Sequence, residues 1–265
     1  MPDTHKGTLR NTASTEIDTC GTLFTIVIVL PFMLIFFRKN FKWTKQPKLQ
    51  LIRGLLLFSA NILFFYSISI ISLAKALTLA FIAPLIVTIF SPFLLGEIVG
   101  FRRWAAVITG FIGSLVVLRP GFVDINLASI SALGTGFLYG IYLIVTRKLH
   151  SSDHPLLTLL LTGIVGAIIG SLLMPFVWVK PSLNEWYMMF AIGFFASIGH
   201  LFLILSLKYA DASKLAPFGY FEIVTNIIIG YLFFNHFPDN WTIFGLFIII
   251  SSGFYIFRRE ALRKT

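Results

Sequence analysis

Residues 54–71 read GLLLFSANILFFYSISII, a run of 18 positions that contains no charged side chain. A bilayer core about 30 Å thick requires roughly 17–25 apolar residues for one transmembrane helix, so this run predicts one complete span. Of the 265 residues, 57% are hydrophobic and only 12% are charged, whereas soluble domains contain roughly a quarter charged residues. The composition therefore indicates an integral membrane protein. It excludes a soluble enzyme, a disordered chain and a disulfide-rich secreted domain.

Nine apolar segments are long enough, or nearly long enough, to cross the membrane. These segments are 21–37, 54–71, 76–95, 104–118, 127–144, 155–177, 184–206, 215–235 and 241–257. Short polar connections separate them, and none shows the residue alternation that is typical of an outer-membrane barrel strand. We therefore expect an all-α, polytopic membrane helical bundle.

Positive charge predicts how these segments are oriented. The chain carries 21 Lys and Arg against 11 Asp and Glu, and the cytoplasmic loops of membrane proteins are enriched in cations. When the segments alternate and the C-terminus is placed inside, most of the cations fall in cytoplasmic loops, Arg53 among them. The surplus charge then sets the topology and contacts anionic lipid headgroups. The single cysteine, Cys20, excludes an intrachain disulfide.

An internal repeat connects the two halves of the chain. A shift of 139 residues places Gly54 on Gly193 and Asn61 on His200, and one further inserted residue places Gly113 on Gly253. Each of the two matching stretches contains three predicted helices, and the charge pattern has them enter the membrane from opposite sides. Inverted repeats are typical of secondary transporters, in which two similar halves alternate access to a central site.

The repeat suggests a division of the chain into four parts. They are a polar tail (1–20), an incomplete first repeat of four helices (21–121), a second repeat of five helices (127–258) and a basic tail (259–265). Gly136 and Gly140, like Gly166 and Gly170, have the GxxxG spacing that predicts close packing between membrane helices.

Short motifs recur along the chain in a fixed order. In the first half they are Phe64-Phe65-Tyr66, Ala83-Pro84-Leu85, Leu95-Gly96-Glu97, Arg102-Arg103-Trp104 and the stretch 110–121. In the second half they are Ala216-Pro217-Phe218-Gly219-Tyr220, Gly230-Tyr231, Phe237-Pro238-Asp239 and Ser252-Gly253. In this order the sequence resembles the EamA-type carriers of the drug/metabolite transporter superfamily. The resemblance implies ten helices in two inverted halves around a central cavity for a small metabolite. It admits S-adenosylmethionine, amino acids, riboflavin-like compounds and drugs as solutes.

The sequence departs from the ten-helix pattern at its start. The missing helix would precede Gly21, because we predict that residues 5–19 form a loop. One interpretation is that a first helix precedes this sequence, which predicts a carrier. The other is a nine-helix variant, which predicts a non-transporting membrane protein derived from such a carrier.

Ionisable side chains inside membrane helices are the main functional candidates, because each costs roughly 2.5–3.5 kcal/mol on insertion scales. Glu222 lies early in segment 215–235, and Asn226 follows one turn later on the same face. His200 lies near the end of the preceding segment, so His200 and Glu222 should lie at matching depth. We expect Glu222 to bind a cationic or amino group of the solute, or to exchange a proton with His200. The alternative is a polar pair that only fixes the helix register.

A second candidate surface follows one face of segment 127–144, where Thr135, Tyr139 and Tyr142 recur at helical spacing. Such a face suits a ring or a cation, which it would bind by stacking and cation–π contact. Ordinary hydrogen bonding between helices is the alternative. Asn61, the counterpart of His200, and Tyr66, in the first motif, complete the set of candidate binding residues.

Catalysis within the membrane is a rival function from another class. It would require a nucleophile with a base, or metal ligands at workable spacing, and the chain has no HExxH, no paired aspartates and no GxSG around Ser197. We expect no enzyme, cofactor or metal. We predict a secondary transporter of the bacterial inner membrane. Its expected partners are a small metabolite, protons and membrane lipid, with a second copy of the chain as a further candidate, and nucleic acid is excluded.

Overall fold

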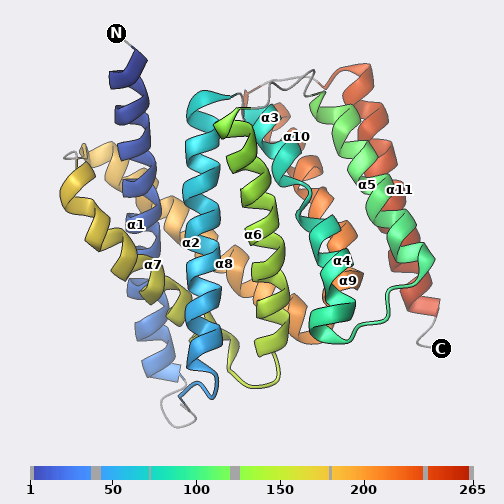
Figure 1. Ribbon diagram of the computed structural model, residues 1–265, viewed down its shortest axis with the longest axis horizontal. Coiled ribbons are helices and arrows are strands. Elements are labelled where there is room, and N and C mark those ends of the chain that lie inside the picture. Colours follow the sequence, from blue (N-terminus) through green and yellow to red (C-terminus); the bar gives the residue numbers. More distant parts are fainter. Residues whose placement is uncertain are drawn as a thin grey trace. The chain divides into compact units, whose positions relative to one another are not determined.

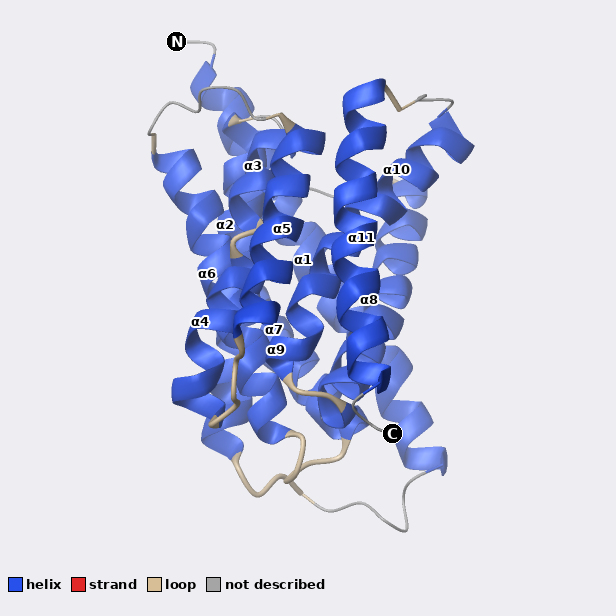
Figure 2. Ribbon diagram, turned by 90° about the vertical axis from the view of Figure 1, so that its right-hand side faces the viewer, coloured by secondary structure: helices blue, strands red, loops and turns tan. Residues whose placement is uncertain are grey.

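The computed structural model of the protein describes residues 3–36, 43–71, 73–119, 126–178, 181–234 and 238–262. Figures 1 and 2 show that these residues form helices joined by short loops. The helices are α1 (Asp3–Phe36), α2 (Pro47–Ile70), α3 (Leu73–Ala80), α4 (Ala83–Leu95), α5 (Phe101–Leu118), α6 (Leu127–Leu149), α7 (Pro155–Val177), α8 (Leu183–Tyr209), α9 (Ala212–Leu215), the 3-10 helix η2 (Ala216–Tyr220), α10 (Phe221–Phe234) and α11 (Asn240–Leu262). The predicted all-helical fold is confirmed.

Several of these helices match the dimensions of a bilayer. Within the described residues, six segments are long and apolar enough to cross a membrane: Pro47–Ile70, Lys75–Leu95, Phe101–Leu118, Leu127–Leu149, Pro155–Pro175 and Leu183–Tyr209. Two shorter apolar helices, Thr19–Ile35 and Asn240–Tyr255, accompany them. All of these segments coincide with predicted spans.

Two helix starts differ from the prediction. The loop that we predicted over residues 5–19 is wrong, because α1 begins at Asp3. Adding a residue to a helix that has already formed costs little, so the polar stretch continues the apolar one. The second helix also begins early, at Pro47, and proline is favoured in the first turn because it lacks a backbone N–H.

The contacts divide the chain into two compact units, and each is described by itself. Unit 1 comprises residues 1–70 and 145–209, and unit 2 comprises residues 71–144 and 210–265. Unit 1 therefore contains α1, α2, α7 and α8, whereas unit 2 contains α3, α4, α5, most of α6, and α9 to α11. Each unit thus combines helices from both halves of the chain.

Small residues bring the helices of unit 1 together. Helices α1 and α7 pack against each other and cross in the view of Figure 1, and Gly166 of α7 lies against Thr22 of α1, where an added Cβ would be 2.7 Å from the threonine Cγ2. A Cβ at Gly54 of α2 would lie 2.6 Å from Val165 of α7, and one at Gly193 of α8 would lie 2.9 Å from Phe24 of α1. Gly54 and Gly193 correspond under the repeat. The contact between α2 and α7 is therefore equivalent to the contact between α8 and α1.

Helices α5 and α11 of unit 2 also make contacts that correspond under the repeat. They run side by side in Figures 1 and 2 and pack along their length. Ser252 Oγ donates to the Ala106 carbonyl at 2.7 Å, and a Cβ at Gly113 would lie 3.2 Å from the Gly245 carbonyl oxygen. The shift of 139 residues places Ala106 on Gly245 and Gly113 on Ser252, so the two contacts are made by equivalent pairs of residues. The packing of α5 on α11 therefore follows the repeat. The alignment of these two helices needs only the shift of 139, without the extra residue that aligned Gly113 with Gly253.

Two predicted spans of unit 2 are broken at corresponding places. Segment 76–95 stops at the end of α3 and restarts at α4 after Phe81 and Ile82, and segment 215–235 changes from η2 to α10 between Tyr220 and Phe221. Phe81 and Tyr220 correspond under the shift of 139, and their ring centroids are 6.0 Å apart. Two equivalent residues in contact mark a pseudo-two-fold axis, which passes between these rings.

Candidate functional site

Glu222 and Asn226 share an exposed face of α10. Glu222 lies in the first turn of this helix, where the helix dipole favours a carboxylate. Both side chains are exposed. Within the described residues, no hydrogen bond or ion pair occupies the Glu222 carboxylate, so it remains available to a ligand or a proton.

The structure places two of the predicted aromatic residues of α6 against each other. The rings of Tyr139 and Tyr142 stack, with centroids 5.5 Å apart and planes inclined by 22°. Tyr142 is fully buried, whereas Tyr139 is half-buried. Thr135 donates its hydroxyl to the Ser131 carbonyl of its own helix at 3.1 Å. Tyr139 is therefore the member of this set that is most accessible to a solute.

The other predicted residues lie in unit 1. Asn61 and Tyr66 are half-buried on α2, and His200 is half-buried on α8. His200 lies close enough to Arg53 for the two side chains to interact electrostatically, so it belongs to the polar interior of unit 1. Because Glu222 belongs to unit 2, the pairing of His200 with Glu222 stays a prediction.

Arg53 is the largest fully buried side chain of the described residues, and its predicted place was wrong. We expected it in a cytoplasmic loop, but α2 begins six residues before it. Its Nε donates to Thr146 Oγ1 at 2.7 Å, and its Nη1 donates to the Thr158 carbonyl at 3.2 Å and to Thr162 Oγ1. Hydroxyl and carbonyl oxygens thus surround a buried cation and connect three helices.

Gln50 extends this network by one turn of α2. It is 2% exposed, and its Nε2 donates to Asp153 Oδ2 at 2.6 Å and to Thr158 Oγ1 at 3.0 Å. Asp153 also accepts a hydrogen bond from Thr44 Oγ1 at 2.5 Å. The signal in the sequence was the spacing of Gln50 and Arg53, which places both on one face of a helix that is otherwise rich in leucine.

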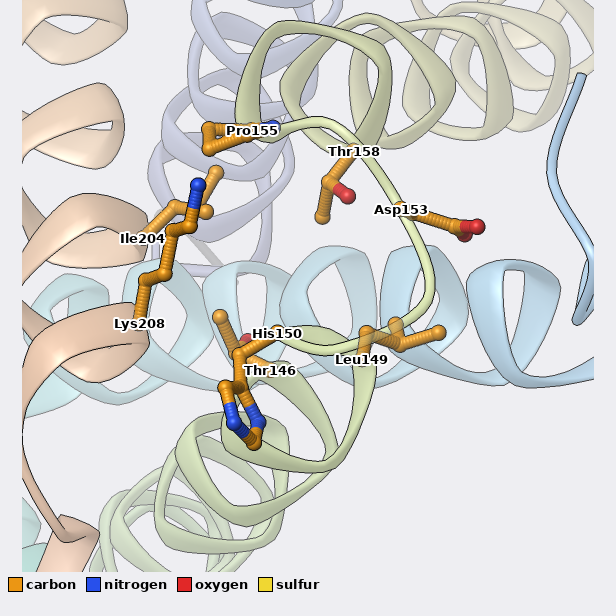
Figure 3. A pocket seen from close by; sticks show the side chains of 8 residues that line it. All are labelled: Thr146, Leu149, His150, Asp153, Pro155, Thr158, Ile204 and Lys208. Carbon is orange, nitrogen blue, oxygen red and sulfur yellow. The ribbon is translucent and has the colours of Figure 1, made fainter. Parts of the chain in front are cut away.

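A shallow pocket opens beside this network, at the turn between α6 and α7. Figure 3 shows its lining residues: Thr146, Leu149, His150, Asp153, Pro155, Thr158, Ile204 and Lys208. The Lys208 and Asp153 side chains point away from each other in this view. His154 caps the N-terminus of α7, where its Nδ1 accepts from the Leu156 N–H at 3.3 Å. Burial and the nearby Lys208 ammonium lower the pKa of His154 below its usual 6.5, which favours the neutral, accepting form.

Glu97 connects two distant segments of unit 2. Its carboxylate oxygens accept from the backbone N–H groups of Ala212 at 2.8 Å and Ser213 at 2.9 Å, and from the Ser213 hydroxyl at 2.6 Å. Arg103 donates to the same hydroxyl oxygen at 2.9 Å and lies 3.7 Å from Asp211. Glu97 thereby caps the N-terminus of α9, just before the broken segment that carries Tyr220.

The predicted residues therefore fall into three groups: Glu222 with Asn226 on α10, the tyrosine pair on α6 with Thr135, and the set Asn61, Tyr66 and His200 in unit 1. The structure adds Gln50, Arg53 and Glu97. Within the described residues, no group of three or more metal-binding side chains comes together. Ionisable side chains within membrane helices usually mark a substrate or ion pathway.

Two repeats of apolar helices, broken at equivalent positions, define a helical membrane protein of the carrier class. The sequence profile of the EamA-like transporter family matches residues 5–119 and 126–258. The chain therefore belongs to the EamA-like transporter family. It is a multi-pass integral membrane protein of a transporter family and not an enzyme.

Individual relatives agree with this assignment. An S-adenosylmethionine uptake transporter of Rickettsia prowazekii is 30% identical over 237 residues, which cover 89% of this chain and 80% of the relative. A riboflavin transporter of Vibrio cholerae is 27% identical and covers 95% of this chain and 85% of the relative. A solved crystal structure has the same fold, with a TM-score of 0.78 at 18% identity, over 96% of this chain and 88% of that chain.

Proposed function

We propose that this protein is a secondary transporter of the bacterial inner membrane that moves a cationic, amine-bearing metabolite by alternating access. S-adenosylmethionine is the first candidate solute. The observation that carries the proposal is the Glu222 carboxylate, which is exposed on α10 and has no partner among the described residues. A carboxylate in an apolar helix is costly and is usually retained for a function.

The stacked tyrosines and the relatives support the same solute. S-adenosylmethionine combines a sulfonium cation and an amino group with an adenine ring. Glu222 provides an anionic contact for the cation, and Tyr139 provides an aromatic face for stacking. The relative from Rickettsia prowazekii transports this metabolite by name and aligns over most of both chains. The cycle would be driven by a proton or solute gradient.

Riboflavin is the second candidate. The near-parallel stack of Tyr139 and Tyr142 suits a large planar ring, and a relative of similar coverage is a riboflavin transporter. Riboflavin carries no cation, however, so it leaves Glu222 without a role in binding. The two candidates therefore differ in how strongly transport depends on that carboxylate.

Uptake by proteoliposomes tests the proposal. The purified chain is reconstituted, and the uptake of labelled S-adenosylmethionine and labelled riboflavin is measured with and without a pH gradient. We expect saturable uptake of S-adenosylmethionine that falls by about tenfold or more in Glu222→Gln, because a hydrogen bond to a charged group contributes about 1.5–3 kcal/mol. Glu185→Gln is the matched control, since Glu185 lies at the start of α8 and accepts from the Ser182 N–H.

Each outcome has a distinct meaning. Uptake that does not respond to Glu222→Gln contradicts the role of Glu222. Uptake of riboflavin alone replaces the first candidate by the second. No uptake of either solute by a folded, reconstituted chain supports the alternative of a non-transporting membrane protein.

A further inference from the structure

The side chain of Tyr220 lies where the two broken segments of unit 2 meet. It is fully buried, and its ring contacts Phe81 across the pseudo-two-fold axis. On another side, the ring lies against the backbone of Gly110, where an added Cβ would be 2.8 Å from the ring Cε2. The ring is therefore held in place from two directions, by α5 and by the end of the α3 segment.

The hydroxyl of Tyr220 has no hydrogen-bond partner among the described residues. A buried hydroxyl without a partner is unfavourable, and phenylalanine would avoid that cost. The equivalent residue in the first repeat is Phe81, so a ring without a hydroxyl is accepted at the corresponding place. Packing alone therefore does not explain why Tyr220 carries an oxygen.

In the part of the chain that the structure describes, three other buried polar atoms also lack a partner, but they differ from this one. The hydroxyls of Ser67 and Ser91 are unpaired, yet a serine in a helix can rotate to bond a carbonyl of its own helix. The Gln50 carbonyl oxygen is unpaired, but its amide group already donates two hydrogen bonds. A tyrosine hydroxyl lies too far from its own backbone to be satisfied in this way.

The N-terminus of α4 lies near Tyr220, because the Tyr220 ring contacts Phe81, two residues before this helix begins. Helix α4 begins at Ala83 and has no side-chain cap at Ile82; Pro84 has no N–H, so the backbone N–H groups on either side of it supply the donors and the positive partial charge of this N-terminus. Segment η2 lies beside this N-terminus, because a Cβ at Gly219 would be 3.3 Å from Pro84 Cγ. The Pro84 carbonyl is already occupied by the Thr88 hydroxyl at 2.8 Å. A phenol hydroxyl and a helix N-terminus together suit an oxygen acceptor.

We infer that the Tyr220 hydroxyl binds a carboxylate of the transported solute, together with the N-terminus of α4, when the broken segments move apart in the transport cycle. Broken membrane helices whose N-termini receive anionic groups are a recurrent form of transporter site. The inference rests on the proposed function, since an amino-acid headgroup such as that of S-adenosylmethionine supplies the carboxylate. Glu222 is exposed whereas Tyr220 is buried, so the two residues make separate contacts.

The test compares two solutes that differ only in the carboxylate. Uptake of labelled S-adenosylmethionine and of decarboxylated S-adenosylmethionine is measured in proteoliposomes with the unaltered chain and with Tyr220→Phe. We expect the unaltered chain to prefer the carboxylated solute. Tyr220→Phe should raise KM for that solute roughly tenfold, the loss of one hydrogen bond, and leave KM for the decarboxylated solute unchanged. Tyr255→Phe on α11, which is 47% exposed, is the matched control.

A melting temperature separates a functional role from a structural one. If the hydroxyl has no partner in the resting protein, Tyr220→Phe should melt at or above the temperature of the unaltered chain. A fall in the melting temperature, or an equal rise in KM for both solutes, overturns the inference. Equal uptake of the two solutes by the unaltered chain overturns it without any variant. If S-adenosylmethionine is not taken up at all, the proposed substrate is wrong, and the inferred contact with its carboxylate is wrong as well.

Discussion

The two units bury polar side chains in different ways. In unit 1, Arg53 and Gln50 lie inside the packed helices, and hydrogen bonds connect them to oxygens of α6 and α7 or of the turn between them. In unit 2, carboxylates make their contacts at helix ends, where Glu97 caps α9 and Asp239 accepts from the Thr242 N–H at the start of α11, and the mid-helix contact of Ser252 with the Ala106 carbonyl involves only neutral groups. The interior of unit 2 also contains the unpaired hydroxyl of Tyr220, whereas the unpaired Gln50 carbonyl oxygen of unit 1 belongs to an amide group that already donates two hydrogen bonds.

This difference suggests a division of roles. Polar groups that are satisfied inside a unit stabilise its packing, so their loss should lower stability. A polar group that is left without a partner adds nothing to the stability of the unit, so its loss should lower transport instead. The unit with continuous helices would then act as a frame, and the unit with broken helices would change during the cycle.

Arg53→Ala should have the largest effect on stability. The substitution removes three hydrogen bonds of a buried cation and leaves a cavity between α2, α6 and α7, so we expect a loss of roughly 3 kcal/mol or more. The melting temperature of the protein in nanodiscs measures it. Arg258→Ala, at an exposed cation of α11, is the control. Equal melting of the two variants would contradict the view that unit 1 depends on its polar interior.

Glu97→Ala should have a smaller effect, because Glu97 is only half-buried. It removes three hydrogen bonds from the N-terminus of α9, and the loss of a helix cap costs about 0.5–2 kcal/mol; we expect about 2 kcal/mol. A double-mutant cycle with Ser213→Ala should show coupling of about 1 kcal/mol, since the two side chains share a hydrogen bond of 2.6 Å. Additive effects would show that Glu97 acts only through the backbone of α9.

The length of apolar runs was enough to predict where most helices lie, because a membrane helix needs a minimum number of apolar residues. The same criterion failed at Arg53, since an apolar run ends at the first charge even when the helix does not. It also missed the breaks at Phe81 and Tyr220, because a break between apolar residues leaves the hydropathy unchanged.

The candidate site was predictable only in part. Glu222 stands out because a carboxylate is unusual within an apolar segment. The tyrosines of α6 stand out because they recur at helical spacing. The contacts of Glu97 involve residues 115 and 116 positions away in the chain, so no local pattern identifies them. The repeat offered a better route, because equivalent residues such as Phe81 and Tyr220 meet at the pseudo-two-fold axis.

Asp239→Asn should have the smallest effect and a definite pH dependence. Hydrogen bonds from Thr242 and Arg119 lower the pKa of Asp239 from 3.8 to about 2, and the Arg119 Nη2 lies 2.6 Å from its carboxylate at an exposed position. A group whose pKa is lower in the folded protein stabilises it above the unfolded pKa, and this contribution is lost as the pH falls toward the folded pKa. The melting temperatures of Asp239→Asn and the unaltered chain should thus differ slightly at pH 6 and converge between about pH 4 and pH 2. A constant difference over this range would mean that the carboxylate charge does not contribute, and that the ends of unit 2, unlike the interior of unit 1, are held by neutral contacts alone.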